Sequence, residues 1–276
     1  VFNPIFRPHA QEEVASEVAR KDIATMAKAK KSVELRYQLL PYNYTLAFEN
    51  NQKGIPLMRP LFFEEPTNEK LVNEPESYLW GNDFLIKPIT KSDVTSTEIY
   101  FPKSSNWFDF YTNEKHKAGT TEDIKVTSDY IPTFVRGGSF IPMIETIQNT
   151  SKYSLENLKL HYYFDENVKS SSGKLYNDDG ATPNAFEKEQ YEILNFNGNN
   201  NDNGNNKSLV IKIATVTGKN FVSADKNVSV LIHNIKQKAK RVFVNGQEQI
   251  FKTFHEPLQV KVTMTKGATS EVKIEY

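Results

Sequence analysis

Residues 35–62 read LRYQLLPYNYTLAFENNQKGIPLMRPLF, and the spacing of the apolar residues changes at Gly54. Before Gly54, apolar residues recur at helical spacing on two faces of the segment 22–51. One face carries Val33, Tyr37, Leu40, Tyr44 and Phe48, and the other carries Leu35, Leu39, Tyr42 and Leu46. A helix with two apolar faces is expected to be buried between other elements. We therefore predict a buried helix that begins after Asp22 as N-cap, bends near Leu40 because of Pro41, and ends at Gly54.

Beyond Gly54 the pattern is that of short strands. A run at 55–63 is apolar and bounded by chain breakers, and residues 78–86 follow after a polar loop. Strands are predicted at 98–101, 107–111, 130–135, 139–142, 158–164, 209–216, 228–232, 241–244, 258–264 and 271–276. Many short strands at this spacing indicate β-sandwiches. The asparagine-rich run 197–206 is predicted as an exposed loop between two strands.

Composition excludes several classes of protein. The chain has 276 residues, 34 basic and 34 acidic, so the formal net charge is zero and a nucleic-acid binder is not expected. It has no cysteine, which excludes disulfides, thiolate catalysis and Cys-ligated zinc. We find no apolar run long enough for a membrane span, and no motif for a metal or cofactor. Because the sequence starts Val-Phe-Asn-Pro, without Met or a signal peptide, we interpret it as cut from a longer protein.

Eleven of the 13 prolines precede residue 143, which indicates a boundary near residue 150. Within residues 1–180, seven segments occur in an order and spacing that resemble the C-terminal part of glycoside hydrolase family 31, the α-glucosidase and α-xylosidase family. They are Phe6–His9, Leu35–Tyr44, Gly54–Phe62, Trp80–Pro88, Ile99–Pro102, Trp107–Tyr111 and Val135–Pro142, and the resemblance ends with Leu175–Gly180.

The resemblance implies a mainly β fold with an α/β remnant, in which the C-terminal end of a (β/α)8 barrel is followed by two antiparallel β-sandwich domains. Residues 1–88 would be the end of the catalytic barrel, with 56–63 as a late barrel strand. Residues 89–152 would be the proximal sandwich and 153–276 the distal one. One departure lies at residues 10–21, where many relatives carry Glu-Pro-Trp and this chain does not.

The activity that the resemblance implies is that of a retaining α-glycosidase, most simply an α-glucosidase that hydrolyses terminal α-linked sugars. Such enzymes use two carboxyl groups about 5–5.5 Å apart. The family carries both aspartates upstream of the motif that ends at His9, so we assign no catalytic residue here and expect this fragment alone to be inactive. Expected partners are an α-linked oligosaccharide or glycoside and the missing N-terminal portion, and the expected location is the periplasm or the exterior of a bacterium.

Two residues are predicted to bind substrate. The resemblance places His9 at the mouth of the barrel, where its imidazole would hydrogen-bond the sugar next to the scissile bond; the alternative is a buried structural histidine. Arg7 either holds an active-site carboxylate through a bidentate pair or forms a structural ion pair.

Other conspicuous residues are interpreted as structural. Arg36 and Arg59 lie in apolar surroundings and need partners, and they are expected to form salt bridges that close the barrel. Arg136-Gly137-Gly138 is predicted to be a tight turn, and 177–180, Asn-Asp-Asp-Gly, a turn in preference to a calcium loop. The aromatic residues of the strands, among them Trp80 and Trp107, are assigned to the core in preference to sugar stacking.

Two other functions are compatible with parts of the sequence. The first is a non-catalytic carbohydrate-binding β-sandwich, against which the predicted helix and strand at 35–63 argue, because a simple lectin sandwich has no use for a helix buried on two faces. The second is a purely structural or interaction module, which would bind no sugar.

Overall fold

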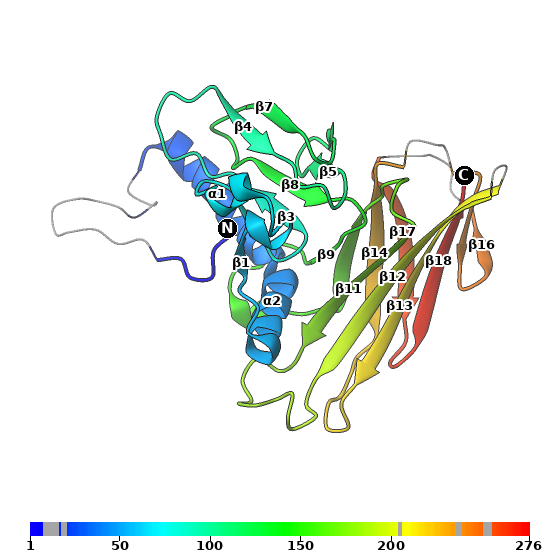
Figure 1. Cartoon of the computed structure of the whole chain (residues 1–276). Coiled ribbons are helices and arrows are strands. Elements are labelled where there is room, and N and C mark those ends of the chain that lie inside the picture. Colours follow the sequence, from blue (N-terminus) through cyan, green and yellow to red (C-terminus); the bar gives the residue numbers. More distant parts are fainter. Residues whose placement is uncertain (8–16, 18–20, 204–205, 236–238, 251–255) are drawn as a thin grey trace.

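The computed structural model of the chain describes all residues except 8–16, 18–20, 204–205, 236–238 and 251–255 (Figure 1). Two helices, α1 (Ile23–Gln38) and α2 (Leu40–Lys53), lie against a six-stranded sheet, and a β-sandwich follows. The predicted fold class, a mainly β chain with a helical remnant at its start, is confirmed. Among the described residues, no helix combines the length and the apolar character needed to cross a membrane.

The predicted helix is present, but as two helices. Asp22 caps α1 by accepting a hydrogen bond from the amide of Thr25 at 2.9 Å, as predicted. The helix ends at Leu39, and α2 starts with Pro41 in its first turn, because proline cannot donate the hydrogen bond that would continue the first helix. Gly54 ends α2 in the left-handed conformation, with a φ of +68°.

The prediction that the helix is buried on two faces is wrong for α1. None of its residues is buried in the described part of the chain, whereas α2 buries Pro41, Tyr42, Thr45 and Leu46 on one side. A helix buries only the face that meets a partner, and the second face of α1 meets none among the described residues.

The sheet under the helices is antiparallel throughout, in the order β1-β2-β3-β8-β5-β6. Its strands are β1 (Met58–Pro60), β2 (Tyr78–Trp80), β3 (Phe84–Ile86), β8 (Thr133–Arg136), β5 (Trp107–Asp109) and β6 (Lys115–His116). The prediction that 56–63 forms a barrel strand is wrong, because β1 pairs antiparallel with β2, whereas the strands of a (β/α)8 barrel are parallel. Only three residues pair, since Pro56 and Pro60 limit the available amide donors.

The same sheet contains strands from both sides of residue 88, since β3 pairs with β8. The limits at 88 and 152 stay predictions. One face of the sheet packs on the helices through Trp80, Phe84 and Tyr42. The other face packs on the short elements η2 (Leu61–Phe63) and α3 (Glu69–Val72) and on a two-stranded sheet of β4 (Ser96–Tyr100) and β7 (Thr121–Lys125).

Tyr42 fixes α2 to this sheet. Its hydroxyl donates to the carbonyl of Trp80 and to the carboxyl of Asp83, both at 3.0 Å, and Ser139 donates to the other oxygen of Asp83 at 2.6 Å. Gly81 permits the approach, because its φ is +66° and a Cβ there would overlap the Tyr42 hydroxyl. Burial raises the pKa of Asp83 above its usual value.

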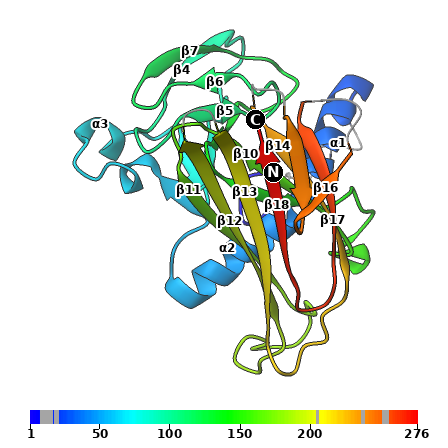
Figure 2. The ribbon, with the colours of Figure 1, turned by 90° about the vertical axis from the view of Figure 1, so that its right-hand side faces the viewer.

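The second half of the chain is a sandwich of two sheets (Figure 2). The inner sheet has the order β17-β14-β10-β9, with β17 (Leu258–Met264), β14 (Lys226–His233), β10 (Asn157–Tyr163) and β9 (Phe140–Met143). The outer sheet has the order β11-β12-β13-β18-β15-β16, with β11 (Ser170–Asn177), β12 (Glu192–Asn203), β13 (Asn206–Thr217), β18 (Thr269–Glu275), β15 (Arg241–Val244) and β16 (Gln247–Gln249). Between β9 and β10 lies the short helix η3 (Thr150–Lys152). The core between the sheets is apolar and aromatic.

One pair departs from the antiparallel prediction, because β10 and β14 run parallel. Parallel neighbours need a long crossover, and here the chain passes through β11, β12 and β13 of the outer sheet between them.

The asparagine-rich run is mostly strand, and the loop prediction is wrong for residues 197–203. They belong to β12, which pairs with β13 along its whole length. Asn200 is buried, accepts a hydrogen bond from the Tyr276 hydroxyl at 2.8 Å and donates to the carbonyl of Glu166 at 3.2 Å. Cross-strand pairing and these side-chain hydrogen bonds outweigh the low strand propensity of asparagine.

Candidate functional site

Of the two predicted substrate-binding residues, His9 lies outside the described residues, and Arg7 is described and exposed. The four residues at the start of the chain are held firmly. Arg36 donates to the carbonyls of Val1, Asn3 and Pro4 at 2.8–3.1 Å, and the hydroxyl of Tyr78 donates to the carbonyl of Phe2 at 2.6 Å. Phe2 is buried beside Phe84.

The two arginines expected in buried salt bridges therefore differ. Arg59 is buried, pairs with Glu49 at 3.6 Å and donates to the carbonyl of Pro56 at 2.8 Å, so the expected salt bridge is present and joins α2 to β1, while its barrel-closing role stays a prediction. Arg36 instead meets carbonyl oxygens among the described residues, which satisfy a guanidinium without a carboxylate.

The turn at 136–138 is confirmed. Gly138 has a φ of +86°, and a Cβ on Gly137 would lie 2.7 Å from Cβ of Asp165. Arg136 forms a bidentate pair with Glu64, at 2.7 and 3.0 Å, and lies 4.6 Å from the ring centre of Trp107. Trp80 and Trp107 are buried, as predicted.

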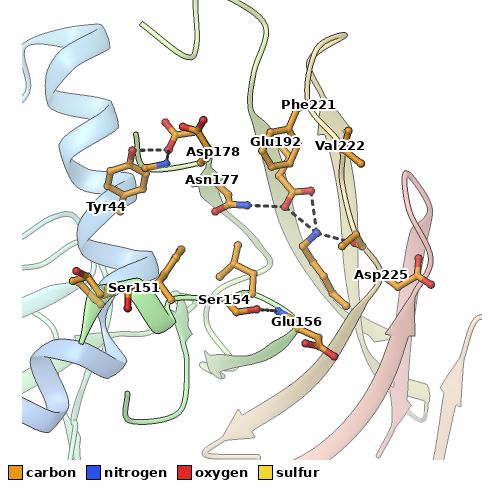
Figure 3. A pocket seen from close by; sticks show the side chains of 18 residues that line it. Tyr44, Ser151, Ser154, Glu156, Asn177, Asp178, Glu192, Phe221, Val222 and Asp225 are labelled. Atoms are coloured by element: carbon orange, nitrogen blue, oxygen red, sulfur yellow. Dashed lines mark hydrogen bonds and ion pairs between the residues drawn. The ribbon is translucent and has the colours of Figure 1, made fainter. Parts of the chain in front are cut away.

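A cavity of about 900 Å3 lies where α2 meets the distal sandwich, between the 150–156 segment, the end of β11 and the 221–226 segment (Figure 3). We call it the helix–sandwich pocket. Its volume lies within the range of roughly 300–1,000 Å3 typical of small-molecule sites. The sequence analysis did not predict it, because its walls come from five separate parts of the chain.

The helical wall is fixed to β11 by aromatic and polar contacts. Phe48 stacks on Tyr176 with ring centres 3.9 Å apart, and Thr45 accepts a hydrogen bond from the amide of Tyr176 at 3.0 Å. The hydroxyls of Tyr44 and Tyr176 donate to the two oxygens of Asp178 at 2.7 and 2.8 Å. Burial raises the pKa of Tyr44, and the hydrogen bond to the Asp178 carboxylate raises it further.

The strand wall contains a buried ion pair. Nζ of Lys226 lies 2.8 Å from Oε1 of Glu192, and the two side chains are 6% and 2% exposed. Glu192 also accepts hydrogen bonds from Ser223 at 2.6 Å and Asn177 at 2.9 Å, and Lys226 donates to the carbonyl of Ala224 at 3.0 Å. Every charge here has a partner, which is the condition for a stable buried pair.

The pocket has an excess of negative charge in a chain whose formal net charge is zero. Five carboxylates and one ammonium line it, namely Glu156, Asp178, Asp179, Glu192, Asp225 and Lys226. Asp179 closes the predicted turn by accepting from the amides of Ala181 and Thr182, at 3.0 and 2.8 Å. The hydrogen bond from the Thr182 hydroxyl at 2.6 Å, together with these two amides, lowers the pKa of Asp179 to about 2. Among the described residues, no group of His, Asp and Glu has the arrangement to hold a metal ion.

Comparison with known proteins gives two family matches. The model described as "Glycosyl hydrolases family 31 TIM-barrel domain" matches residues 1–46, and the one described as "Glycosyl hydrolase family 31 C-terminal domain" matches residues 54–141. The first match ends inside α2, and the second contains all six strands of the sheet β1-β2-β3-β8-β5-β6.

Two curated relatives illustrate the sequence similarity. The "Alpha-xylosidase" of Saccharolobus solfataricus is 36% identical over 164 residues, which are 59% of this chain and 22% of that protein. The "Alpha-glucosidase 2" of Bacillus thermoamyloliquefaciens is 33% identical over 224 residues, 80% of this chain and 26% of that protein. The chain thus spans about a quarter of the length of these relatives.

Solved structures share the fold. A dextranase of Flavobacterium johnsoniae superposes with a TM-score of 0.85 and 22% identity, covering 96% of this chain and 34% of that one. An α-xylosidase of Xanthomonas citri superposes with a TM-score of 0.77 and 23% identity, covering 98% of this chain and 27% of that one.

The fold and these matches define a class of multidomain glycoside hydrolase in which β-rich domains follow a TIM barrel. The chain belongs to glycoside hydrolase family 31 and corresponds to its C-terminal portion.

Proposed function

We propose that the chain is the C-terminal part of a retaining α-glycosidase, most simply an α-glucosidase acting on terminal α-linked sugars. The observation that carries the proposal is that the two family matches follow one another, since residues 1–46 match the TIM-barrel domain and 54–141 the C-terminal domain. The nucleophile and the acid/base are aspartates upstream of this chain. One attacks the anomeric carbon, and the other protonates the leaving oxygen and then activates water.

The start of the chain, which precedes the two proposed substrate-binding residues, is fixed to the helices and the first sheet. Arg36 and Tyr78 anchor the backbone of residues 1–4, and Phe2 is buried under α1 and α2. His9, which lies outside the described residues, is proposed from the family resemblance to hydrogen-bond the sugar next to the scissile bond. For Arg7 the proposed site role is to hold an active-site carboxylate, and the alternative is a structural ion pair.

The test uses the protein together with the upstream portion, assayed on p-nitrophenyl α-glucoside and α-xyloside. Loss of one hydrogen bond to the sugar costs about 1.4 kcal/mol, so His9→Ala is expected to lower kcat/KM about tenfold. His116→Asn is the matched control, because His116 is buried and hydrogen-bonded to Glu122 at 2.8 Å; it should lower the melting temperature and leave KM unchanged. Absence of hydrolysis of every α-glycoside tested would contradict the proposed activity, and an unchanged kcat/KM in His9→Ala would remove His9 from the site.

We also propose that the enzyme acts in the periplasm or outside a bacterial cell. The absence of cysteine is compatible with an oxidising compartment, since no thiol is available for adventitious pairing. Fractionation of the source cells, followed by immunodetection with an antibody against residues 153–276, tests this. Recovery of all the protein with cytoplasmic markers would contradict it.

A further inference from the structure

The helix–sandwich pocket contains a buried hydroxyl group without a partner. Oη of Tyr153 is inaccessible to solvent and makes no hydrogen bond with the described residues. Tyr153 lines the pocket together with Asp178 and Glu192. An unsatisfied buried hydroxyl costs about 1–3 kcal/mol, so such a group indicates a missing hydrogen-bond partner.

The mouth of the pocket combines open acceptors with apolar surface. Glu156 is exposed at the end of the 150–156 segment, and Asp225 accepts only the amide of Lys266, at 2.9 Å, among the hydrogen bonds of the described residues. Phe221 and Val222 also line the pocket, and Val222 is 82% exposed (Figure 3). An exposed apolar side chain beside carboxylates is suited to a ligand with alternating polar and apolar faces.

The charge and chemistry of the lining select among ligand classes. Five carboxylates against one ammonium repel phosphates and other anions. A metal ion finds no set of ligands among the described residues. A wholly apolar ligand would leave the Tyr153 hydroxyl and the carboxylates at the mouth without polar contacts. A neutral polyol fits, because its hydroxyls donate to carboxylates while its C–H faces cover apolar side chains.

We propose that the helix–sandwich pocket binds a neutral oligosaccharide of the same class as the substrate, through Tyr153, Glu156 and Asp225 and against Phe221 and Val222. The choice of oligosaccharide rests on the proposed function, whereas the polyol chemistry rests on the pocket. Since one wall is α2 and the others belong to the sandwich, a bound sugar joins the helix of the barrel match to the distal sheets.

The experiment is calorimetric titration of the protein, with its upstream portion present, with maltotriose and with isomaltotriose. The variants are Tyr153→Phe, which removes only the hydroxyl, and Glu156→Gln, which removes only the charge. Glu145→Gln is the matched control, because Glu145 is an exposed carboxylate that pairs with Lys159 at 2.6 Å outside the pocket. We expect two binding sites, one of them weakened about tenfold or more by either pocket variant and unchanged in the control. Hydrolysis of p-nitrophenyl α-glucoside should stay the same in all three.

Failure of this inference is distinguishable from failure of the proposed function. Active enzyme with one binding site, or with two sites that neither pocket variant weakens, would overturn the inference and leave the function intact. Tighter binding of putrescine than of either sugar at the Glu156-dependent site would overturn the ligand class. Sugar binding that depends on Tyr153 and Glu156 in a protein without hydrolase activity would support the pocket and contradict the proposed function. Melting curves of both variants verify that they fold.

Discussion

Replacement of Lys226 by methionine tests the buried ion pair of the pocket wall. The change keeps most of the volume and removes the ammonium, so Glu192, 2% exposed, retains only its hydrogen bonds from Ser223 and Asn177. Removing one partner of a buried pair leaves an uncompensated charge and costs about 3–5 kcal/mol. We therefore expect Lys226→Met to lower the free energy of unfolding of the distal sandwich by about 4 kcal/mol.

The assay is urea denaturation followed by far-UV circular dichroism, because the two tryptophans lie in the first sheet and do not report directly on the distal sandwich. With a denaturant slope of about 2 kcal/mol per M, the midpoint falls by about 2 M. Lys212→Met is the control, since Lys212 pairs with Glu271 at 3.2 Å on the surface, with side chains 51% and 39% exposed. A surface pair contributes about 0–1 kcal/mol, so this midpoint should move by at most about 0.5 M.

The double variant Glu192→Leu/Lys226→Met separates charge from packing. It removes both charges and should recover a large part of the loss, although Ser223 and Asn177 then lose their acceptor. The reasoning is refuted if Lys226→Met shifts the midpoint no more than Lys212→Met, or if the double variant is less stable than the single one.

Three further predictions concern other regions. Residues 1–276 alone should aggregate in size-exclusion chromatography, because Ile5, Phe6, Ile23 and Val33 are exposed in the part of the chain that matches the TIM barrel. Burial lowers the pKa of His161 to about 3 and of His233 to about 4. Below pH 6.5 the unfolded chain therefore binds protons at these two imidazoles that the folded chain does not bind. The free energy of unfolding in urea should fall by about 1.4 kcal/mol per pH unit for each imidazole as the pH drops below 6.5. Arg136→Lys should cost about 1–2 kcal/mol in the tryptophan-fluorescence transition, because lysine cannot form the bidentate pair with Glu64.

Each of these has a contradicting result. A monodisperse monomer of residues 1–276 that melts cooperatively would show that the exposed apolar residues need no partner. His161→Gln should reduce the slope of stability against pH, and an unchanged slope between pH 6.5 and 4 would contradict the buried neutral pair, whose Nδ1 and Nε2 atoms lie 2.9 Å apart. Arg241→Lys is the control for Arg136, because Arg241 pairs with Glu248 on the surface; equal effects of the two changes would refute the argument.

Several local features followed from the sequence because they depend on neighbouring residues. Asp22 caps α1, Gly54 ends α2, and the alternating residues of 258–264 form a half-buried strand as predicted. The partners of Arg36 and Arg59 were harder to predict. A guanidinium needs partners, but sequence does not say whether they are carboxylates, as for Arg59, or carbonyls, as for Arg36. His9 and Arg7 stay predictions that rest on the family resemblance.

The errors share one cause, which is that long-range partners override local preference. Residues 197–203 have poor strand propensity, yet β13 and the hydrogen bonds of Asn200 make them strand. The apolar run at 56–63 is compatible with a parallel or an antiparallel strand, and only pairing with β2 decided its direction. The helix–sandwich pocket could not be predicted, since its walls meet only after α2 docks on β11.

The sequence by itself determined the family, the balance of strand over helix and the ends of the helices, because composition, periodicity and capping act over a few residues. The tertiary structure alone decided which strands pair, which face of each helix is buried and where Tyr153, Glu156 and Asp225 come together. These depend on contacts between residues tens of positions apart, and such contacts are selected by the packing of the whole chain.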